Sequence, residues 1–332
     1  MKLPKLQDLD ISNKAVIVRA DLDVGSDVNK GEDRLRALLD TLIYLADRQA
    51  KITVIGHRGR PGGKIDEKLS LKPVGELLEK LLKKRIGKER LTKLSLQVQE
   101  NLRFNPGERE NNVNFAKSLS EHGEYFINDA FANSHRKHAS IETLPLLEKY
   151  GSKKGLGFHF QEEIKNLERV FKNPKQPVIS VIGGVKRDKI SHIEGLLKFS
   201  DLILIGGRLP EHLKSTESKV IVAKLTKKGT DVDQESINIF KEKIVGAGTI
   251  ILSGPMGKYE ESSSMNGTKE ILNAISSSSA FKIAGGGETE NALDDLGLLD
   301  KFNWISSGGG AMLEFLSKGI LPGIKALQAS KR

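Results

Sequence analysis

Basic side chains follow several apolar segments in the first half of the chain, where strands would end. Five of them could act together on one ligand: Arg34, His57, Arg60, Arg103 and Arg136. Because loops that follow parallel strands share one edge of a sheet, we expect these residues to converge beside Asp21 and Asp23. Guanidinium groups bind phosphate and carboxylate through paired hydrogen bonds. The pattern predicts a site for one small anion, whereas Arg36 and Arg58 fit solvated surface positions.

Five apolar segments of the second half run into glycine-rich turns. These turns are 183–184, 206–207, 253–257, 285–287 and 308–310. Glycine lets the backbone approach a phosphate closely, and a helix that follows the turn offers unpaired N–H groups and a positive dipole end. A single turn of this kind is commonly a simple chain reversal. Five in one half of the chain favour a phosphate or nucleotide site.

Several other chemistries are disfavoured by what the sequence lacks. It contains no G-x-x-x-x-G-K-[ST], no G-x-G-x-x-G and no protein-kinase catalytic set, which argues against P-loop, dinucleotide-binding and protein-kinase sites. It contains no cysteine, so disulfides, thiolate metal sites and cysteine nucleophiles are excluded. His135 and His138 could suggest a metal pair, but no third ligand accompanies them.

Composition and charge narrow the class of protein. The hydrophobic content of 38% is typical of a globular protein, and no apolar run approaches the length of a membrane span. The N-terminus lacks the apolar core of a signal peptide, so we expect a cytoplasmic protein without membrane association. The formal charge of +10 attracts polyanions such as nucleic acid or phosphorylated metabolites. Nucleic acid is not expected as a partner, because aromatic residues make up only 5% and the key arginines follow strands.

Alternating strand-like and helix-like segments position these residues. Strands are predicted at 14–20, 51–56, 94–98, 124–128, 178–182, 201–205, 220–223, 249–252 and 281–284. Helices are predicted at 33–49 and from Pro73 through Leu82. The alternation predicts an α/β fold with parallel sheets covered on both faces. The 332 residues suit two Rossmann-like domains, 1–160 and 174–311, joined by a charged hinge helix at 161–173.

In their order along the chain, the motifs resemble those of phosphoglycerate kinases. The first half carries VRADLD at 18–23, HRGRP at 57–61, ENLRF at 100–104 and NDAFANSHRKH at 128–138. The second half carries GGVKRDKI at 183–190, GPMGKYE at 254–260, GGGET at 285–289 and SGGGA at 307–311, followed by LPG at 321–323. The resemblance extends along nearly the whole chain.

The resemblance implies a monomeric glycolytic enzyme that transfers a phosphoryl group between ATP and 3-phosphoglycerate, giving ADP and 1,3-bisphosphoglycerate. It implies a 3-phosphoglycerate site in the first domain, formed by Asp21, Asp23, Arg34, His57, Arg60, Arg103 and Arg136. It implies a nucleotide site in the second domain, formed by Lys186, Lys189, Gly206, Glu260, Gly286, Gly287, Glu288 and Thr289. In the family the C-terminal segment, here 312–332, returns to pack on the first domain.

The expected mechanism relies on alignment and charge rather than on a base. The nucleophile is a carboxylate with a pKa of roughly 4, which is already ionised at neutral pH. Arg34 and Lys189 are expected to neutralise the transferring phosphoryl group, and the amides of Gly287 and Gly310 to complete an electrostatic cradle. Mg²⁺ would bridge the nucleotide phosphates, with Glu288 as its candidate ligand. The domains are expected to close around their substrates.

Several positions depart from the family pattern. Asp23 stands where the family has asparagine, which adds negative charge beside an anionic substrate, and Ser253 also replaces an asparagine. Glu288 replaces an aspartate. The stretch from Lys186 to Lys189 is one residue short, and an alignment anchored on Lys189 puts Val185 at the position of the first lysine.

The span 207–229 is also short, and GGRLP replaces GGGMA at 206–210. In the family this region helps to enclose the adenine, so we expect loose selectivity for the base. These departures leave one alternative open, a catalytically weak sensor of nucleotides or phosphorylated metabolites on the same fold.

Overall fold

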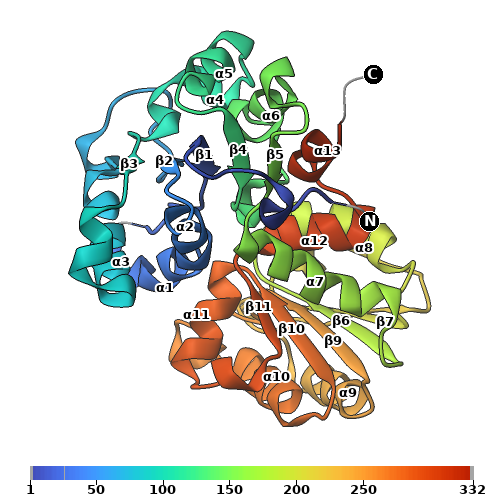
Figure 1. The fold of residues 1–332 in the computed structure, drawn as a ribbon. Helices are drawn as coiled ribbons and strands as arrows, with labels where there is room; N and C mark the ends of the chain where they lie inside the picture. Colours follow the sequence, from blue (N-terminus) through green and yellow to red (C-terminus); the bar gives the residue numbers. More distant parts are fainter. Residues whose placement is uncertain (1–2, 26, 330–332) are drawn as a thin grey trace. The chain divides into compact units, whose positions relative to one another are not determined.

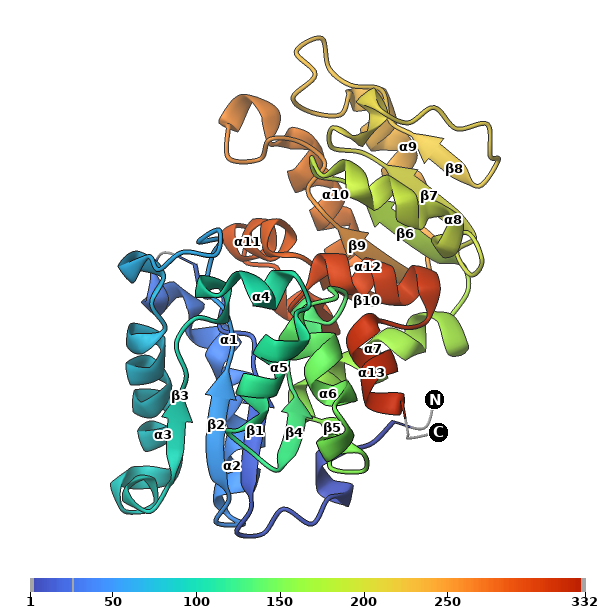
Figure 2. The same ribbon diagram turned by 90° about the horizontal axis from the view of Figure 1, so that it is seen from above.

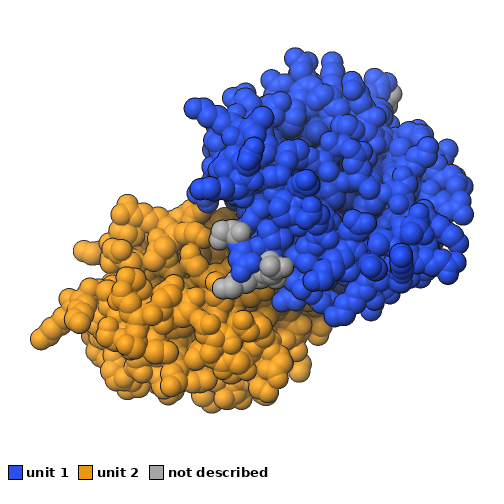
Figure 3. Space-filling model, turned by 90° about the vertical axis from the view of Figure 1, so that its left-hand side faces the viewer, with its two compact units in different colours: residues 1–163, 320–332 blue, residues 164–319 orange. Residues whose placement is uncertain are grey.

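The computed structural model describes residues 3–25 and 27–329. The chain forms two compact units: one contains residues 1–163 and 320–332, and the other contains residues 164–319 (Figure 3, blue and orange). The predicted hinge helix is present as α7 (Phe158–Lys172), and the border between the units falls inside it. The returning segment begins at Ile320 rather than at 312, because helix α12 (Gly309–Lys318) belongs to the second unit.

The first unit is built on a parallel sheet of five strands in the order β3-β2-β1-β4-β5 (Figure 1). The strands are β1 (Ala15–Arg19), β2 (Lys51–Ile55), β3 (Leu96–Val98), β4 (Tyr125–Asn128) and β5 (Lys154–Leu156). The order reverses between β1 and β4, and ligands bind beyond the carboxyl edge of a sheet at such a switch point. All the predicted anion-binding residues follow these strands, so the topology brings them to this edge.

Helices cover this sheet and bury alternate strand residues. Val16 and Val18 of β1 join a core with leucines from α1, α2 and α3. The helices of this unit are α1 (Glu32–Arg36), α2 (Leu39–Ala46), α3 (Lys72–Thr92), α4 (Pro106–Arg109), α5 (Val113–Ser120), α6 (Leu144–Leu146) and α13 (Pro322–Gln328), with the start of α7. The single helix predicted over 33–49 is wrong, because α1 and α2 are separate.

The returning helix α13 packs beside α6 and β5 (Figure 2). The side chain of Lys154 in β5 is buried, and its Nζ donates to three carbonyl oxygens. The acceptors are Ala326 and Ala329, both at 2.9 Å, and Pro145 at 2.8 Å. The ammonium therefore pairs carbonyls at the end of α13, which would otherwise be unsatisfied.

The second unit is built on a parallel sheet of six strands in the order β11-β10-β9-β6-β7-β8. The strands are β6 (Val178–Ile182), β7 (Leu202–Ile205), β8 (Val220–Val222), β9 (Thr249–Ser253), β10 (Phe281–Gly285) and β11 (Trp304–Ser306). The order reverses between β6 and β9, so the glycine turns that follow the strands lie along a second switch-point edge.

Helices also cover this sheet. One core contains Phe240 of α9 and Ile271 of α10, packed with Val181 of β6. Elsewhere in the unit, Phe171 of α7 contacts the rings of Phe199 and Phe315 at centroid distances of 6.1 and 5.9 Å. Besides α7 and α12, the helices are α8 (Ile193–Leu196), α9 (Gln234–Val245), α10 (Asn266–Ser277) and α11 (Gly287–Asp295). In the described part of the chain, no helix has the length and apolarity needed to cross a membrane.

Candidate active site

Two aspartates and their partners form one side of the site in the first unit. The Nη1 of Arg34 in α1 donates to Asp21 Oδ2 at 2.7 Å, and Asn133 donates to Asp21 Oδ1 at 3.2 Å. Asp23 Oδ1 accepts from the backbone N–H of Gly59 at 2.8 Å. The structure therefore brings the predicted pair Asp21 and Arg34 into direct contact, and it joins the loop after β1 to the loop after β2.

His57 lies buried beside these carboxylates. Its Nε2 is 3.6 Å from Asp23 Oδ2, and its Nδ1 is 3.2 Å from Nη2 of Arg19. Burial, with a smaller contribution from Arg19 and Arg103, outweighs the opposing effect of Asp23 and lowers the pKa of His57 to about 4. The imidazole is therefore neutral at physiological pH.

The predicted arginines Arg60, Arg103 and Arg136 line one basic pocket with a volume of about 240 Å³. Arg109 of α4 and His138 line it as well. Burial is the main cause that lowers the pKa of Arg103 to about 10. Burial also lowers the pKa of Arg136, and like-charge repulsion from Arg60 adds to that shift. These guanidinium groups remain charged at neutral pH, so the pocket concentrates positive charge that a multivalent anion could neutralise.

Some residues of this region were not predicted from the sequence to lie at the site. Arg109 carries no motif signal, although its place three residues after Pro106 in a short helix could have suggested a loop near the sheet edge. His138 was considered only as a member of the rejected metal pair and of the motif at 128–138. Arg19 was considered only as a strand residue and as part of the motif at 18–23, without a role of its own. The expectation that Arg58 is solvated is wrong, because Arg58 is buried and donates to the carbonyls of Gly25 and Ser70 at 2.9 and 3.2 Å.

In the second unit, the glycine turns pack directly against one another. A Cβ added at Gly207 would lie 2.3 Å from the backbone N of Gly184, and one added at Gly254 would lie 2.3 Å from the backbone O of Gly183. A Cβ at Gly309 would lie 2.7 Å from the Cα of Gly286. These contacts require glycine, and they create a surface on which backbone groups rather than side chains face a ligand.

Lys189 is a half-buried cation of this surface. Its Nζ donates to the carbonyls of Gly183 and Ser253 at 2.8 and 3.1 Å. Burial lowers its pKa to about 8, although the nearby carboxylate of Glu288 opposes that shift. Lys186 is exposed by contrast, and its Nζ lies 3.6 Å from Oε1 of Glu288. Lys189 and Glu288 therefore place opposite charges beside the first glycine turn.

The predicted residue Thr289 holds two of the turns together. Its side chain is buried, and its hydroxyl donates to the carbonyl of Gly285 at 3.0 Å and accepts from the N–H of Gly254 at 2.8 Å. Gly286 has a φ of 104°, which a residue with a side chain rarely adopts. Thr289 thus contacts the neighbouring turns through its side chain.

A cavity of about 490 Å³ opens beside these turns. Glu260 and Glu288 line it among the predicted residues, whereas Lys186, Lys189, Gly206, Gly286, Gly287 and Thr289 do not. The shortened region contributes Arg208, Lys228 and Gly229 to its wall. Arg208 forms a double hydrogen bond with Glu211 at 2.9 and 2.8 Å, so its guanidinium is already engaged.

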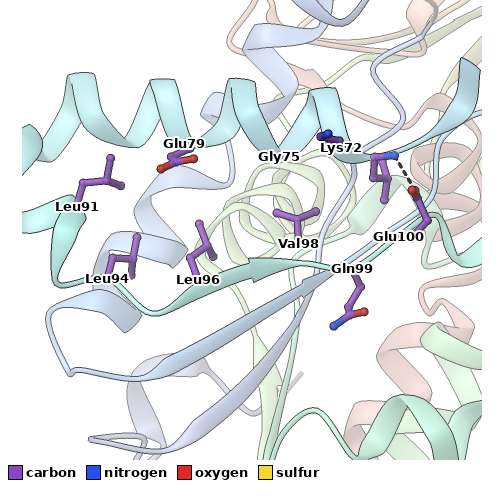
Figure 4. A pocket seen from close by; sticks show the side chains of 10 residues that line it. Lys72, Gly75, Glu79, Leu91, Leu94, Leu96, Val98, Gln99 and Glu100 are labelled. Carbon is purple, nitrogen blue, oxygen red and sulfur yellow. Dashed lines mark hydrogen bonds between the residues drawn. The ribbon is translucent and has the colours of Figure 1, made fainter. Parts of the chain in front are cut away.

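A further cavity, of about 340 Å³, lies between α3 and β3 in the first unit (Figure 4). Leu91, Leu94, Leu96 and Val98 supply most of its apolar wall. The figure shows the hydrogen bond at its end, in which the N–H of Leu71 donates to Glu100 at 2.7 Å. The predicted site residues do not line this cavity.

The comparisons with known proteins agree along the whole chain. The model of the family described as Phosphoglycerate kinase matches residues 6–228 and 211–318. A phosphoglycerate kinase of Coprothermobacter proteolyticus is 33% identical over 394 residues, covering 98% of this chain and 99% of the relative. The phosphoglycerate kinase of Nautilia profundicola is 35% identical over 398 residues, covering 99% of this chain and 100% of the relative.

The chain belongs to the phosphoglycerate kinase family. Solved structures support the fold: the phosphoglycerate kinase of Coxiella burnetii has a TM-score of 0.77 at 29% identity, covering 98% of this chain and 99% of that one. The enzyme of Pyrococcus horikoshii OT3 has a TM-score of 0.80 at 25% identity, covering 98% of both chains. The predicted family, α/β fold and carboxyl phosphotransferase class are therefore confirmed, and the alternative of a non-catalytic sensor is not supported.

The same comparisons locate the shortening of this phosphoglycerate kinase. Its alignment with the Coprothermobacter proteolyticus enzyme extends over 394 positions, although the chain has 332 residues. The two segments of the family match meet and overlap at residues 211–228, within the span 207–229 that was predicted to be short.

Proposed function

We propose that this phosphoglycerate kinase binds 3-phosphoglycerate at the carboxyl edge of the first sheet and ATP at the glycine turns of the second. The basic pocket carries this proposal, because three predicted arginines and Arg109 line a single cavity of about 240 Å³. Four guanidinium groups with a neutral histidine suit a phosphate dianion better than a neutral metabolite. Substrates of this family are anionic at both ends, which fits such a concentration of charge.

We propose that the substrate phosphate binds Arg60, Arg103 and Arg136. Asp21, Asp23 and His57 would then contact the middle of the substrate, and Arg34 would reach its carboxylate. In the structure Arg34 is already held by Asp21, with its side chain 28% exposed, so it is oriented before the substrate arrives.

In the second unit, we propose that the glycine turns hold the nucleotide phosphates. Helices α11 and α12 begin at Gly287 and Gly309, so their first N–H groups are available to anions at the turns. Lys189 uses two of its three donors on carbonyls, which leaves one for a phosphoryl oxygen. Glu260 lines the cavity and is proposed to contact the ribose.

Transfer then needs no general base, because the attacking carboxylate is already ionised. Arg34 and Lys189 would neutralise the phosphoryl oxygens, and the amides of Gly287 and Gly310 would support them. Direct transfer also requires a state in which the two bound substrates lie within reaction distance.

Mg²⁺ fits the donor chemistry of the second unit. Magnesium is usually held through one or two carboxylates together with substrate phosphates and waters. Glu288 is a partly exposed carboxylate at the start of α11, beside Lys189, and we propose it as the protein ligand. In the described part of the chain, no three or more histidine, aspartate or glutamate residues cluster as a metal cage, so the ion would arrive with the nucleotide. When bound, the ion supplies positive charge to the nucleotide phosphates.

A coupled assay of ATP consumption that depends on 3-phosphoglycerate tests the proposal. We expect Lys189→Ala to lose most of this activity while calorimetry still detects 3-phosphoglycerate binding, because the two sites lie in different units. Lys198→Ala changes an exposed lysine of the same unit and should leave activity unchanged. An inactive wild-type protein that still binds both ligands would refute the enzymatic function. The resemblance further suggests a monomer in the cytoplasm, and light scattering can test the first of these.

A further inference from the structure

A fully buried arginine lies directly behind His57. Arg19 is the last residue of β1, and its side chain has no exposed surface. Its Nε donates to Oγ of Ser140 at 2.8 Å, and its Nη1 donates to the carbonyl of Ala20. Its Nη2 lies 3.2 Å from Nδ1 of His57. The guanidinium group of Arg19 therefore links His57 to the segment that follows β4.

This contact determines which nitrogen of His57 carries the proton. A guanidinium group has donors but no acceptor, and it stays charged in proteins. The Nδ1 of His57 must therefore accept, and in a neutral ring the proton then resides on Nε2. The Nε2 is buried and has no hydrogen-bond partner among the described residues, since Asp23 Oδ2 is 3.6 Å away. An N–H group in this state is available to a ligand.

Arg19 is itself held by a buried carboxylate. Glu108 has no exposed surface, and it accepts from Oγ of Ser140 at 2.6 Å and from the backbone N–H of Ser140 at 3.0 Å. The Ser140 hydroxyl donates its only proton to Glu108, so its oxygen must face Arg19 as an acceptor. The hydrogen bonds therefore form a chain with fixed directions. Ser140 donates to Glu108, and Arg19 donates to both Ser140 and His57.

We infer that Arg19 is a positioning residue that fixes His57 as the Nε2–H tautomer, so that this group donates one hydrogen bond to an anionic oxygen of the substrate. The last clause rests on the proposed function, because it requires 3-phosphoglycerate to bind against His57. Without Arg19, either nitrogen could carry the proton, and Asp23 would favour a ring protonated on both. The charged or titratable groups that act on His57 are Arg19, Arg103, Asp21, Asp23 and His138.

Nuclear magnetic resonance of protein labelled with ¹⁵N-histidine tests the tautomer without any substrate. We expect Nδ1 of His57 to show the shift of an unprotonated nitrogen and Nε2 that of a protonated one at neutral pH. In Arg19→Lys, which keeps the buried charge near Glu108, we expect the two shifts to move toward each other as the tautomers mix. If Arg19→Lys does not fold, Ser140→Ala provides the same test by removing the acceptor of Nε. A wild-type ring protonated at Nδ1, or variant shifts equal to those of the wild type, would overturn the inference.

Steady-state kinetics test the link to the substrate. We expect Arg19→Lys to raise the KM for 3-phosphoglycerate roughly tenfold, the effect of weakening one hydrogen bond to a charged group, with kcat at saturation within about twofold. Arg58→Lys is the matched control, because Arg58 is a buried arginine of the same region that bonds backbone carbonyls. Its KM should stay near that of the wild type. Mixed tautomers with an unchanged KM would refute the role of His57 as donor, whereas an inactive wild-type protein would refute the proposed function alone.

Discussion

At the scale of the residue, Asp23 places a negative charge where an anionic substrate is proposed to bind. Burial alone would raise the pKa of Asp23, but the nearby His57 ring and the hydrogen bond from the Gly59 N–H outweigh it and hold that pKa well below its usual range. The carboxylate is therefore ionised in the free enzyme. No neighbouring arginine is hydrogen-bonded to Asp23 in the described part of the chain, and Arg34 is paired with Asp21 instead.

Asp23→Asn is therefore expected to tighten 3-phosphoglycerate binding. The amide oxygen still accepts from Gly59, while the repulsion between two like charges about 4 Å apart, about 1 kcal/mol in high dielectric, is removed. We expect the KM for 3-phosphoglycerate to fall roughly fivefold, with a stronger salt dependence, because less repulsion then offsets the attraction of the arginines. Asp33→Asn, at a carboxylate whose side chain is 95% exposed, should change neither quantity. A higher KM in Asp23→Asn would show that the charge assists binding.

The proposed role of Lys189 predicts that the nucleotide step depends on pH. Because burial lowers the pKa of Lys189 to about 8, the ammonium loses its proton as the pH rises through that value in the free enzyme. We expect kcat/KM for ATP to be full below pH 8 and to decline above it, whereas kcat should decline at higher pH because bound phosphates favour the charged form. In Lys189→Arg, whatever activity remains should lose the decline. A wild-type profile that is flat to about pH 9.5 would contradict this assignment.

The predicted ends of the strands indicated which residues lie at one edge of the sheet. They did not indicate which of these residues contact each other. The position of Arg34 at a helix start could be predicted, whereas its ion pair with Asp21 depends on where α1 lies over the sheet. The sequence indicated no role for Arg19 beyond its place in a strand. A buried charged side chain needs polar partners, and those of Arg19, Ser140 and His57, come from distant segments. Its neighbours in sequence give no sign of them.

At the scale of the element, the glycine turns that follow the strands of the second sheet pack against one another through their backbones, with no side chains between them. Gly254 shows why glycine is needed: its φ is 97°, and a Cβ would lie 2.3 Å from the carbonyl O of Gly183 and 2.5 Å from Nζ of Lys189. A methyl group there would both strain the backbone and displace Lys189, the proposed catalytic lysine.

Gly254→Ala is accordingly expected to lower both stability and ATP affinity. We expect a loss of about 1–3 kcal/mol in the free energy of unfolding, from the positive φ and the backbone clash. The control is Gly246→Ala at the end of α9, where φ is −89° and no atom lies within 4 Å of the added carbon. That change should be neutral or slightly stabilising. Urea unfolding and ATP titration of both variants measure the difference, and equal stability would contradict the packing argument.

The sequence predicted long periodic elements better than short ones. Nine of the strands had a recognisable apolar run, but β5 (KGL) and β11 (WIS) did not, whereas β3 and β8 of the same length lie within the apolar runs at 94–98 and 220–223. The break between α1 and α2 was missed because the apolar spacing continues across it. The start of the returning segment was placed too early, since α12 packs with α8 of the second unit and only α13 meets Lys154 of the first.

At the scale of the whole molecule, the chain has both parallel sheets, but the span that forms part of the cavity wall in the second unit is shorter than in the family. Both sheets have the switch-point order expected for an α/β enzyme. The alignment with the Coprothermobacter proteolyticus relative spans 394 positions against 332 residues here, and the family match divides at 211–228. The shortened span 207–229 therefore borders the cavity of about 490 Å³ in the second unit rather than the basic pocket. Relative to the family pattern, the wall of this cavity is therefore reduced.

This reduction predicts a low selectivity for the nucleobase. An enzyme rejects a wrong base strongly when it buries polar groups that only the right base can pair. Here three polar side chains of the cavity wall already have partners: Arg208 binds Glu211, and the Thr230 hydroxyl lies 2.7 Å from that of Ser264. The phosphates, held by backbone and Lys189, would supply most of the affinity.

We therefore expect ATP and GTP to be used with kcat/KM values within about tenfold of each other, which corresponds to about 1.4 kcal/mol. Parallel initial-rate measurements with the two nucleotides at one Mg²⁺ concentration test this directly. Arg208→Ala provides the matched variant, because it frees Glu211 at the cavity wall. It should change the ratio between the nucleotides more than it changes the KM for 3-phosphoglycerate, which is proposed to bind in the other unit. A preference for ATP of a thousandfold or more in the wild type would mean that a group outside this wall reads the base, and would contradict the link between the shortened segment and selectivity.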